Sequence, residues 1–264
     1  MTETVAVAGS GTIACGIAVT AARTSDVILL ARSEASADRA RASIDKQAGK
    51  LEVDVSGVTV TTDPSELSRA TYVIEAVSED PATKVGVFAQ LLEHAPSDAI
   101  LATTTSSLSI EELAQGAGVA ERFVGLHVFN PVTKMELIEL IFPSTASEST
   151  KDRSRALAAA WGKTAVEMPD MPGFVVNKLL FPFLFEAVRL KEQSGLSAKD
   201  IDTCMQLGAG QPMGPFALLD FVGLDVSKAI GEVIGADVPQ AVEDLVAEGK
   251  LGRKSGEGFL DWRR

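Results

Sequence analysis

The pattern of apolar and polar residues divides the chain into two parts. Up to Met168, short apolar runs alternate with longer stretches in which apolar residues recur at helical spacing. The runs are rich in Val, Ile and Leu, as expected of strands buried on both faces of a sheet. They lie at 4–8, 26–33, 57–61, 72–77, 99–103, 123–126 and 135–141. Repeated strand–helix alternation predicts an α/β fold with a mostly parallel, doubly wound sheet.

Beyond Met168 the pattern becomes helical. Pro172-Gly173 breaks the chain, and apolar residues then dominate from Phe174 to Leu190. This stretch is hydrophobic nearly all round, which predicts burial in a core or in an interface between two copies. Further helical stretches lie at 198–207, 215–221, 226–234 and 239–248, with no strand signal of comparable strength. We therefore expect an α/β domain over residues 1–170 and an all-helical domain over 171–264.

The first apolar run leads directly into G-S-G-T-I-A, which begins at Gly9. Gly9 permits a tight turn, and Gly11 lets the backbone approach a pyrophosphate. The backbone N–H groups of Thr12 and Ile13 then lie at a helix N-terminus, which favours negative charge. Ala14, in place of a third glycine, still allows close helix–strand packing. The order of strand, glycine turn and helix predicts a Rossmann-type dinucleotide-binding domain, with a purely structural βα turn as the alternative.

The end of the second apolar run bears on cofactor choice. NAD-binding domains of this type usually carry an acidic residue there, which binds the ribose hydroxyls. This chain has Ala31, followed by Arg32 and Ser33. An arginine and a hydroxyl can bind a 2′-phosphate by charge-assisted hydrogen bonds, and Arg39 or Arg41 could add charge. The sequence therefore predicts NADP(H) in preference to NAD(H), unless Arg32 is simply a solvated loop residue.

Two strand-like runs flank the turn Asn130-Pro131. His127 ends the first run, and Glu139 lies within the second. Two strands joined by a turn can bring the Glu139 carboxylate back to the imidazole of His127. Such a pair fixes the histidine tautomer and suits a general acid/base near neutral pH. The alternative is a core histidine beside a surface glutamate; the other histidine, His94, is expected at the surface of a polar helix end.

Composition excludes several classes of function. The 264 residues carry a formal net charge of −12, which disfavours nucleic acid and anionic membranes as partners. Cys15 and Cys204 offer neither a disulfide framework nor a metal-ligand cluster, so we expect no metal and a reducing compartment. No apolar stretch is long enough to span a bilayer, and the N-terminus has no signal-peptide pattern. The expected location is the cytoplasm.

Seven motifs together resemble the L-3-hydroxyacyl-CoA dehydrogenase family, which includes bacterial 3-hydroxybutyryl-CoA dehydrogenases. The likeness covers nearly the whole chain, and the order and spacing of the motifs agree with the family. The motifs are G-S-G-T-I-A-C-G-I-A at Gly9, V-I-E-A-V-S-E-D at Val73, I-L-A-T-T-T-S-S-L-S-I at Ile100, G-L-H-V-F-N-P-V at Gly125, P-G-F-V-V-N-K-L-L at Pro172, L-G-A-G-Q-P-M-G-P-F at Leu207 and G-R-K-S-G-E-G-F at Gly252.

The resemblance implies roles for individual residues. His127 would be the catalytic acid/base, with Glu139 as its carboxylate partner. Ser106 and Asn177 would hydrogen-bond the reacting oxygen and the substrate. The positions that match the family's cofactor site are Glu79, Lys84, Ser106, Asn130 and Lys254. From the residues alone, the glycine-rich tail that carries Lys254 is as well explained by a surface turn.

The resemblance also implies an overall function. The expected reaction is NAD(P)-dependent interconversion of an (S)-3-hydroxyacyl thioester and the 3-ketoacyl thioester. A homodimer formed by the helical domain, and an active site in the cleft between the two domains, are implied as well. An alternative class of function is a nucleotide-binding protein that has lost its activity. The presence of all four catalytic positions, His127, Glu139, Ser106 and Asn177, argues against it.

Three departures from the family affect this expectation. Ala31-Arg32 replaces the usual acid, and Thr104 stands where the family has asparagine. The stretch from Ser33 to Tyr72 is also shorter than usual, where the family carries a helical arm that helps to hold CoA. The carrier of the acyl group therefore stays open between CoA and an acyl-carrier protein. A free hydroxy acid or sugar acid is a further alternative on the same fold.

Overall fold

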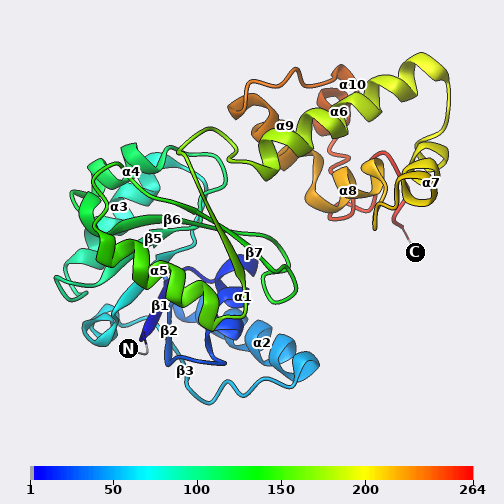
Figure 1. Cartoon of the computed structure of the whole chain (residues 1–264). Helices are drawn as coiled ribbons and strands as arrows, with labels where there is room; N and C mark the ends of the chain where they lie inside the picture. Colours follow the sequence, from blue (N-terminus) through cyan, green and yellow to red (C-terminus); the bar gives the residue numbers. More distant parts are fainter. Residues whose placement is uncertain (1–2, 264) are drawn as a thin grey trace. The chain divides into compact units, whose positions relative to one another are not determined.

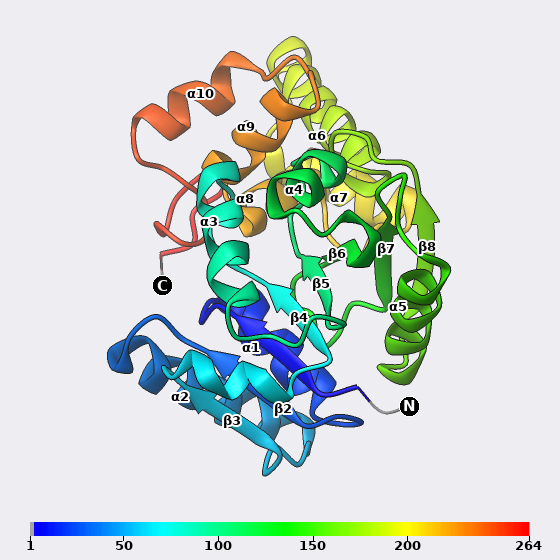
Figure 2. The same ribbon diagram turned by 90° about the vertical axis from the view of Figure 1, so that its left-hand side faces the viewer.

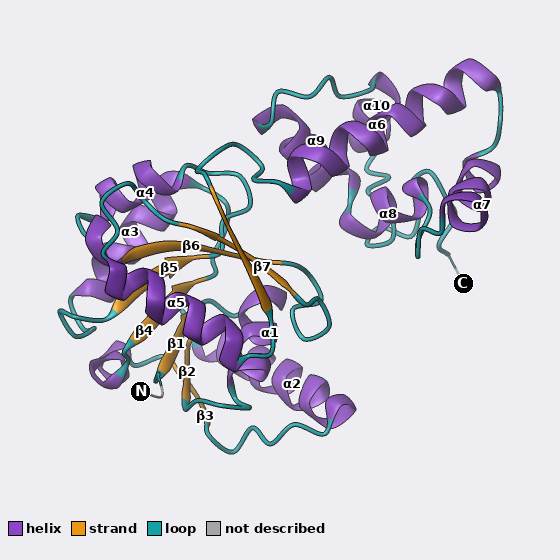
Figure 3. Cartoon of the chain, in the orientation of Figure 1, coloured by secondary structure: helices purple, strands orange, loops and turns teal. Residues whose placement is uncertain are grey.

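The computed structural model describes residues 3–263, and the chain divides into two compact units at Met171–Pro172. The first unit is a sheet covered by helices, and the second is built from helices (Figures 1 and 3). Each unit is described by itself. Among the described residues, no helix is both long and apolar enough to cross a lipid bilayer.

The first unit contains one eight-stranded sheet of order β3-β2-β1-β4-β5-β6-β7-β8, which Figure 2 shows in sequence from β3 to β8. Strands β1 to β6 are parallel, β7 is antiparallel to β6, and β8 is parallel to β7. The strands span Val5–Ala8, Val27–Leu30, Val58–Thr61, Tyr72–Glu75, Ile100–Thr103, Phe123–Val128, Leu137–Ile141 and Thr164–Met168. The prediction of a mostly parallel sheet is confirmed, and the reversal at β7 places two strands around a turn.

Helices cover both faces of this sheet, as a doubly wound fold requires. One face packs its apolar side chains against α1, α2 and α5. On the other face, Phe88 of α3 packs edge-on against Phe123 of β6, and Ile110 of α4 meets the backbone of Gly125. The helices of this unit are α1 (Thr12–Ala21), α2 (Glu34–Leu51), α3 (Pro81–Leu92), α4 (Ile110–Ala117) and α5 (Glu148–Ala160), with short 3-10 turns η1 (Pro64–Arg69) and η2 (Ala120–Arg122).

The second unit is helical, as the pattern beyond Met168 predicts. Its core gathers large apolar side chains from α6, α8, α9 and α10, and its described residues contain only isolated bridges in the tail, without a strand. The helices are α6 (Val176–Ser194), α7 (Ala198–Ala209), α8 (Pro215–Val222), α9 (Leu224–Val233) and α10 (Gln240–Ala247).

In the single chain, the apolar helix is buried on one face only, so burial of its other face in an interface between two copies stays a prediction. Helix α6 starts at Val176, because Phe174 before it adopts a positive φ of 49°. One face of α6 packs into the core through Phe181, Leu184 and Phe185. On the outer face, the side chain of Leu179 is 70% exposed and that of Leu190 is 45% exposed.

Candidate active site

The antiparallel pair β6–β7 brings His127 and Glu139 together. The two residues are direct cross-strand partners in the register of the pair, so their side chains leave the sheet on the same face. His127 Nδ1 lies 2.6 Å from Glu139 Oε2, and both side chains are buried. The strand–turn–strand pattern correctly indicated this contact. The burial of Glu139 rules out the alternative, in which it is a surface residue.

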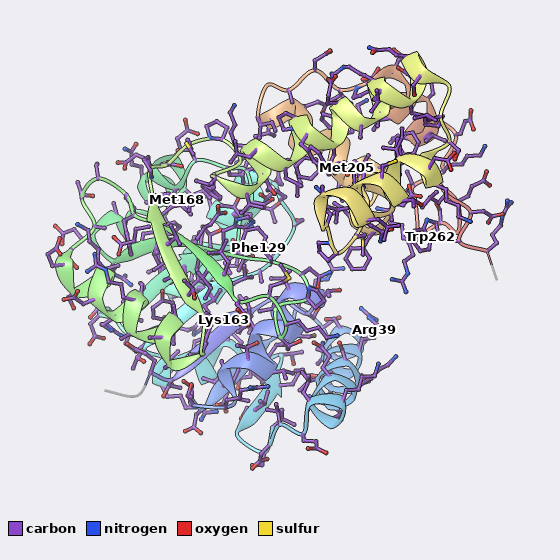
Figure 4. All side chains as sticks on the ribbon, turned by 45° about the vertical axis from the view of Figure 1, so that its right-hand side comes forward. Arg39, Phe129, Lys163, Met168, Met205 and Trp262 are labelled. Carbon is purple, nitrogen blue, oxygen red and sulfur yellow. The ribbon has the colours of Figure 1, made fainter. Side chains whose placement is uncertain are left out.

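This contact determines which nitrogen of His127 can take part in proton transfer. A carboxylate only accepts hydrogen bonds when ionised, so Nδ1 donates its proton to Glu139. Nε2 is then the ring nitrogen that could exchange a proton with a substrate. The ring of Phe129 lies beside the imidazole, with the two centroids 4.5 Å apart, and Figure 4 labels this residue. The imidazole is therefore held by a charge on one side and by packing on the other.

The turn between β6 and β7 is fastened to the rest of the unit. Lys163 Nζ donates to the carbonyl oxygens of Val132 and Met135, at 2.6 Å each. Gly16 of α1 lies against Val132, and a β-carbon at Gly16 would come within 2.9 Å of the Val132 side chain. These contacts fix the segment that links His127 to Glu139. Asn130, predicted to line the cofactor site, is exposed where this segment leaves β6.

The turn between β1 and α1 has the form that a dinucleotide phosphate needs. Gly9 has a φ of 141°, and a β-carbon there would meet the carbonyl oxygen of Ala76 at 2.3 Å. Gly11 is the N-cap of α1, with no side-chain capping bond and open space where a β-carbon would stand. Gly11 and Thr12 are exposed, and Ile13 is half-buried. The uncapped N–H groups and the open space at Gly11 fit a bound pyrophosphate.

The end of β2 presents a cationic side chain. Ala31 is buried, whereas Arg32 and Ser33 are exposed. The hydroxyl of Ser33 is engaged as the N-cap of α2, accepting from the backbone N–H of Ser36 at 3.4 Å. Arg41 donates to Asp38 and to the carbonyl oxygen of Val60, whereas Arg39 extends from the exposed side of α2 (Figure 4). Within residues 3–263, Arg32 and Arg39 form no ion pair.

Ser106 belongs to a turn that is organised by Glu79. One oxygen of Glu79, Oε1, accepts from Thr105 Oγ1 at 2.5 Å, from the Ser106 N–H at 2.8 Å and from Ser107 Oγ at 3.0 Å. Lys84 Nζ lies 3.3 Å from the other oxygen. Burial would raise the pKa of Glu79, but the charge of Lys84 and these hydrogen bonds lower it below its usual value. Glu79 is therefore a carboxylate near neutral pH.

The helical unit carries the two remaining predicted site residues. Asn177 is buried in the first turn of α6. Lys254 is half-exposed in the tail, where its Nζ lies 2.6 Å from a carboxylate oxygen of Asp225. Binding of substrate by Asn177 and of cofactor by Lys254 stays a prediction. In the part of the chain that the structure describes, no cluster of His, Cys, Asp or Glu could hold a metal ion.

The structure adds residues that the sequence reading passed over. Glu75 and Asp220 are fully buried carboxylates, and each accepts at least three hydrogen bonds from other parts of its unit. A signal for Glu75 was present, because an acid directly after the apolar residues of a buried strand needs partners. Asp220 had a weaker signal, since its partners lie about forty residues away.

Comparisons with known proteins identify relatives over the whole chain. Residues 4–171 match the family model of the 3-hydroxyacyl-CoA dehydrogenase NAD-binding domain, and residues 173–262 match that of the C-terminal domain. The human mitochondrial hydroxyacyl-coenzyme A dehydrogenase is 38% identical, covering 98% of this chain and 91% of the relative. A 3-hydroxybutyryl-CoA dehydrogenase of Clostridioides difficile is 38% identical, covering 98% and 99%.

A solved structure is similar over its full length. The crystal structure of (S)-3-hydroxybutyryl-CoA dehydrogenase PaaH1 from Ralstonia eutropha superposes with a TM-score of 0.92 at 33% identity, covering 100% of both chains. The alignment with the human enzyme extends over 285 positions, more than the 264 residues of this chain. That relative therefore contains residues that this chain lacks. In this chain, α2, β3 and η1 are the only elements between Ser33 and Tyr72.

Proposed function

The chain belongs to the 3-hydroxyacyl-CoA dehydrogenase family, whose members are oxidoreductases acting on a CH–OH group, and on that premise we propose that it interconverts a short (S)-3-hydroxyacyl-CoA and the 3-ketoacyl-CoA with NADP(H). The buried contact between His127 and Glu139 carries the proposal. A nicotinamide cofactor, when bound, supplies or accepts the hydride. The protein must then supply a proton to the substrate oxygen and stabilise the charge that develops there.

The chain's own residues match these two tasks. Protonated His127 would give its Nε2 proton to the oxygen at C3 in the reducing direction, and Glu139 stabilises the imidazolium. The hydroxyl of Ser106 would donate to the same oxygen as negative charge grows on it. Asn177 keeps its predicted role as a further hydrogen-bonding group for the substrate. Oxidation of the alcohol follows the same path in reverse.

The proposed function is tested by the loss of absorbance at 340 nm when the purified protein is mixed with acetoacetyl-CoA and NADPH. Rapid oxidation of NADPH that depends on acetoacetyl-CoA is the expected result. The same acyl group on an acyl-carrier protein, and free acetoacetate, are the comparison substrates. If the protein turns over one of these and not the CoA thioester, the proposed substrate becomes the carrier-protein thioester or the free acid. Either outcome would agree with the short segment between Ser33 and Tyr72.

Preference for NADPH is proposed from Ala31 and Arg32. Replacing Arg32 with alanine should raise the KM for NADPH roughly tenfold to a hundredfold, because one charge-assisted hydrogen bond to a phosphate is lost. The KM for NADH should change little. Steady-state kinetics with both cofactors measure the effect, and Arg69→Ala is the control, since it removes an exposed arginine that pairs with Glu66. An equal change for both cofactors in Arg32→Ala would contradict the phosphate assignment.

A homodimer is proposed from exposed leucines of the helical unit. Leu179 of α6 and Leu207 of α7 are 70% and 84% exposed, and a second copy that covered them would remove this apolar surface from water. Light scattering after gel filtration should give the mass of two chains. The double variant Leu179→Asp/Leu207→Asp should shift the protein to one chain, whereas Val166→Asp, on the edge strand β8, should stay dimeric. A monomeric unmodified protein would refute the proposal.

A further inference from the structure

We propose that Glu75 and Lys84 are positioning residues, which act through Glu79 to fix the backbone of the turn that carries the Ser106 hydroxyl. This inference rests on the proposed function, in which Ser106 binds the reacting oxygen. Together, Glu75, Lys84 and Glu79 are called the carboxylate–lysine network below. The network connects the middle of the sheet to the turn that carries Ser106, and each link is a direct polar contact.

Glu75 anchors the network in the sheet. It is the last residue of β4, and its register partner on β5 is Thr103, which in turn pairs with Gly125 of β6. Successive side chains alternate between faces, so Glu75, Thr103 and His127 leave the sheet on the same face. Glu75 accepts from the Val77 N–H at 2.6 Å and from Thr103 Oγ1 at 2.7 Å. The anchor therefore stands on the face that holds the proposed acid/base.

Lys84 is the second link. It lies in the first turn of α3 and is fully buried, with Nζ at 2.8 and 2.9 Å from the two oxygens of Glu75. Its third contact is Oε2 of Glu79 at 3.3 Å. An ammonium group has three N–H donors, and these three oxygens match them in number. All described polar contacts of Lys84 Nζ are thus to Glu75 and Glu79. This favours a role in positioning Glu79 over direct contact with the cofactor.

Glu79 is the third link and holds the turn itself. Its Oε1 gathers donors from three consecutive residues, Thr105, Ser106 and Ser107. The strong contact to Ser106 is made by its backbone N–H at 2.8 Å, while its hydroxyl lies farther away, at 3.4 Å. The backbone is therefore fixed, and the long hydroxyl contact is weak enough to be exchanged for a substrate oxygen.

Breaking the network would affect the rate by displacing the Ser106 hydroxyl, the proposed donor to the reacting oxygen. A donor aimed at developing charge contributes only when it is fixed before the reaction, and displacements of about 1 Å can cost roughly a hundredfold in rate. Without the Lys84 contact, Glu79 loses the charge that fixes its second oxygen. The 105–107 turn would then sample several positions, which lowers kcat without removing any group that touches the cofactor.

A double-mutant cycle with Ser106→Ala tests the proposal. The pair variant Glu75→Gln/Lys84→Met removes both buried charges together and keeps similar side-chain volumes, so it avoids an isolated buried ion. We expect kcat for acetoacetyl-CoA reduction to fall about tenfold in the pair variant and roughly tenfold to a hundredfold in Ser106→Ala. The combined variant should match Ser106→Ala within about twofold, because both changes remove one effect. Multiplication of the two losses would overturn the proposal.

The split between kinetic constants separates the indirect role from direct cofactor binding. The pair variant should keep its KM for the nicotinamide cofactor within about twofold of the unmodified protein. A rise in that KM with little change in kcat would assign Lys84 to the cofactor and refute the positioning role. Glu79→Ala, at a partly exposed position, should reproduce the fall in kcat. Asp80→Ala, which removes only the N-cap of α3, should leave kcat unchanged.

A measurement without substrate keeps this inference separate from the proposed function. The N–H of Ser106 donates to Glu79, so its hydrogen exchange should be protected in the unmodified protein and accelerated at least about tenfold in Glu79→Ala and in the pair variant. Unchanged protection in both variants would refute the network whatever the substrate is. Lack of turnover with every thioester, together with accelerated exchange, would instead refute the proposed function and leave the network standing.

Discussion

Replacing His127 with alanine is expected to lower kcat for acetoacetyl-CoA reduction by about a hundredfold or more, because a positioned general acid contributes roughly that factor. The loss should appear equally in kcat and in kcat/KM, since the proton is transferred only in the transition state. Glu139→Ala is expected to have an effect of similar size. Without the carboxylate, neither the Nδ1–H tautomer nor the imidazolium is stabilised.

The design must separate catalysis from folding, because both residues are buried. Removing His127 takes a hydrogen-bond donor away from the buried Glu139 carboxylate, which can destabilise the sheet. His127→Gln provides a second variant. Its amide can still donate a hydrogen bond to Glu139, but it cannot act as a general acid or base. Circular dichroism melts show whether each variant is folded. His94→Ala removes the other histidine, at the end of α3, and should keep full activity. Near-normal turnover in a folded His127→Gln would refute the mechanism.

The contact on which this prediction depends could be predicted from sequence because it needs only local information. Two apolar runs and a turn place His127 and Glu139 on adjacent strands, and the period of two along a strand decides which side chains share a face. The glycine turn at Gly9 follows from backbone geometry in the same way, since its φ of 141° is accessible mainly to glycine. Local pattern was sufficient for both features.

The carboxylate–lysine network could not be predicted from the sequence, because it depends on how α3 packs against the sheet. The motif V-I-E-A-V-S-E-D contains both glutamates, but only the fold shows that Lys84 is buried between them. Ser33 shows the opposite case, because its hydroxyl is used to cap α2, a local role that competes with phosphate binding. For α6 the sequence left two alternatives open, because hydrophobicity alone does not show whether a core or another chain covers a helix.

Replacing Asp220 with alanine is expected to lower the free energy of unfolding of the helical unit by about 2–4 kcal/mol, because three donors lose their acceptor at once. The carboxylate of this α8 residue accepts from the backbone N–H groups of Phe259 and Leu260 and from Trp262 Nε1, at 2.8–2.9 Å. The tail also packs tightly around it. A β-carbon at Gly258 would lie 2.1 Å from Asp220 Oδ1, and the Phe259 ring contacts Phe216 at a centroid distance of 5.1 Å.

Urea unfolding followed by tryptophan fluorescence measures this loss, because Trp262 itself donates to Asp220. Asp220→Asn keeps one acceptor oxygen and should fall between the unmodified protein and Asp220→Ala. The matched control is Asp261→Asn, which changes an exposed acid of the same tail whose described partner is Arg263. Equal urea midpoints for Asp220→Ala and Asp261→Asn would show that the tail is not held by the buried carboxylate.

The same variant also tests why the tail is held. The Asp220 backbone carbonyl oxygen accepts from the N–H of Arg253 and is kept in Asp220→Ala, but loss of the three carboxylate hydrogen bonds should loosen the tail that also carries Lys254. The assay is run without urea, at a temperature where Asp220→Ala is still folded. Under these conditions the KM of this variant for NADPH should rise towards that of Lys254→Ala. If the KM instead stays at the unmodified value while stability falls, the Asp220 carboxylate serves the helical core and is not needed to position Lys254.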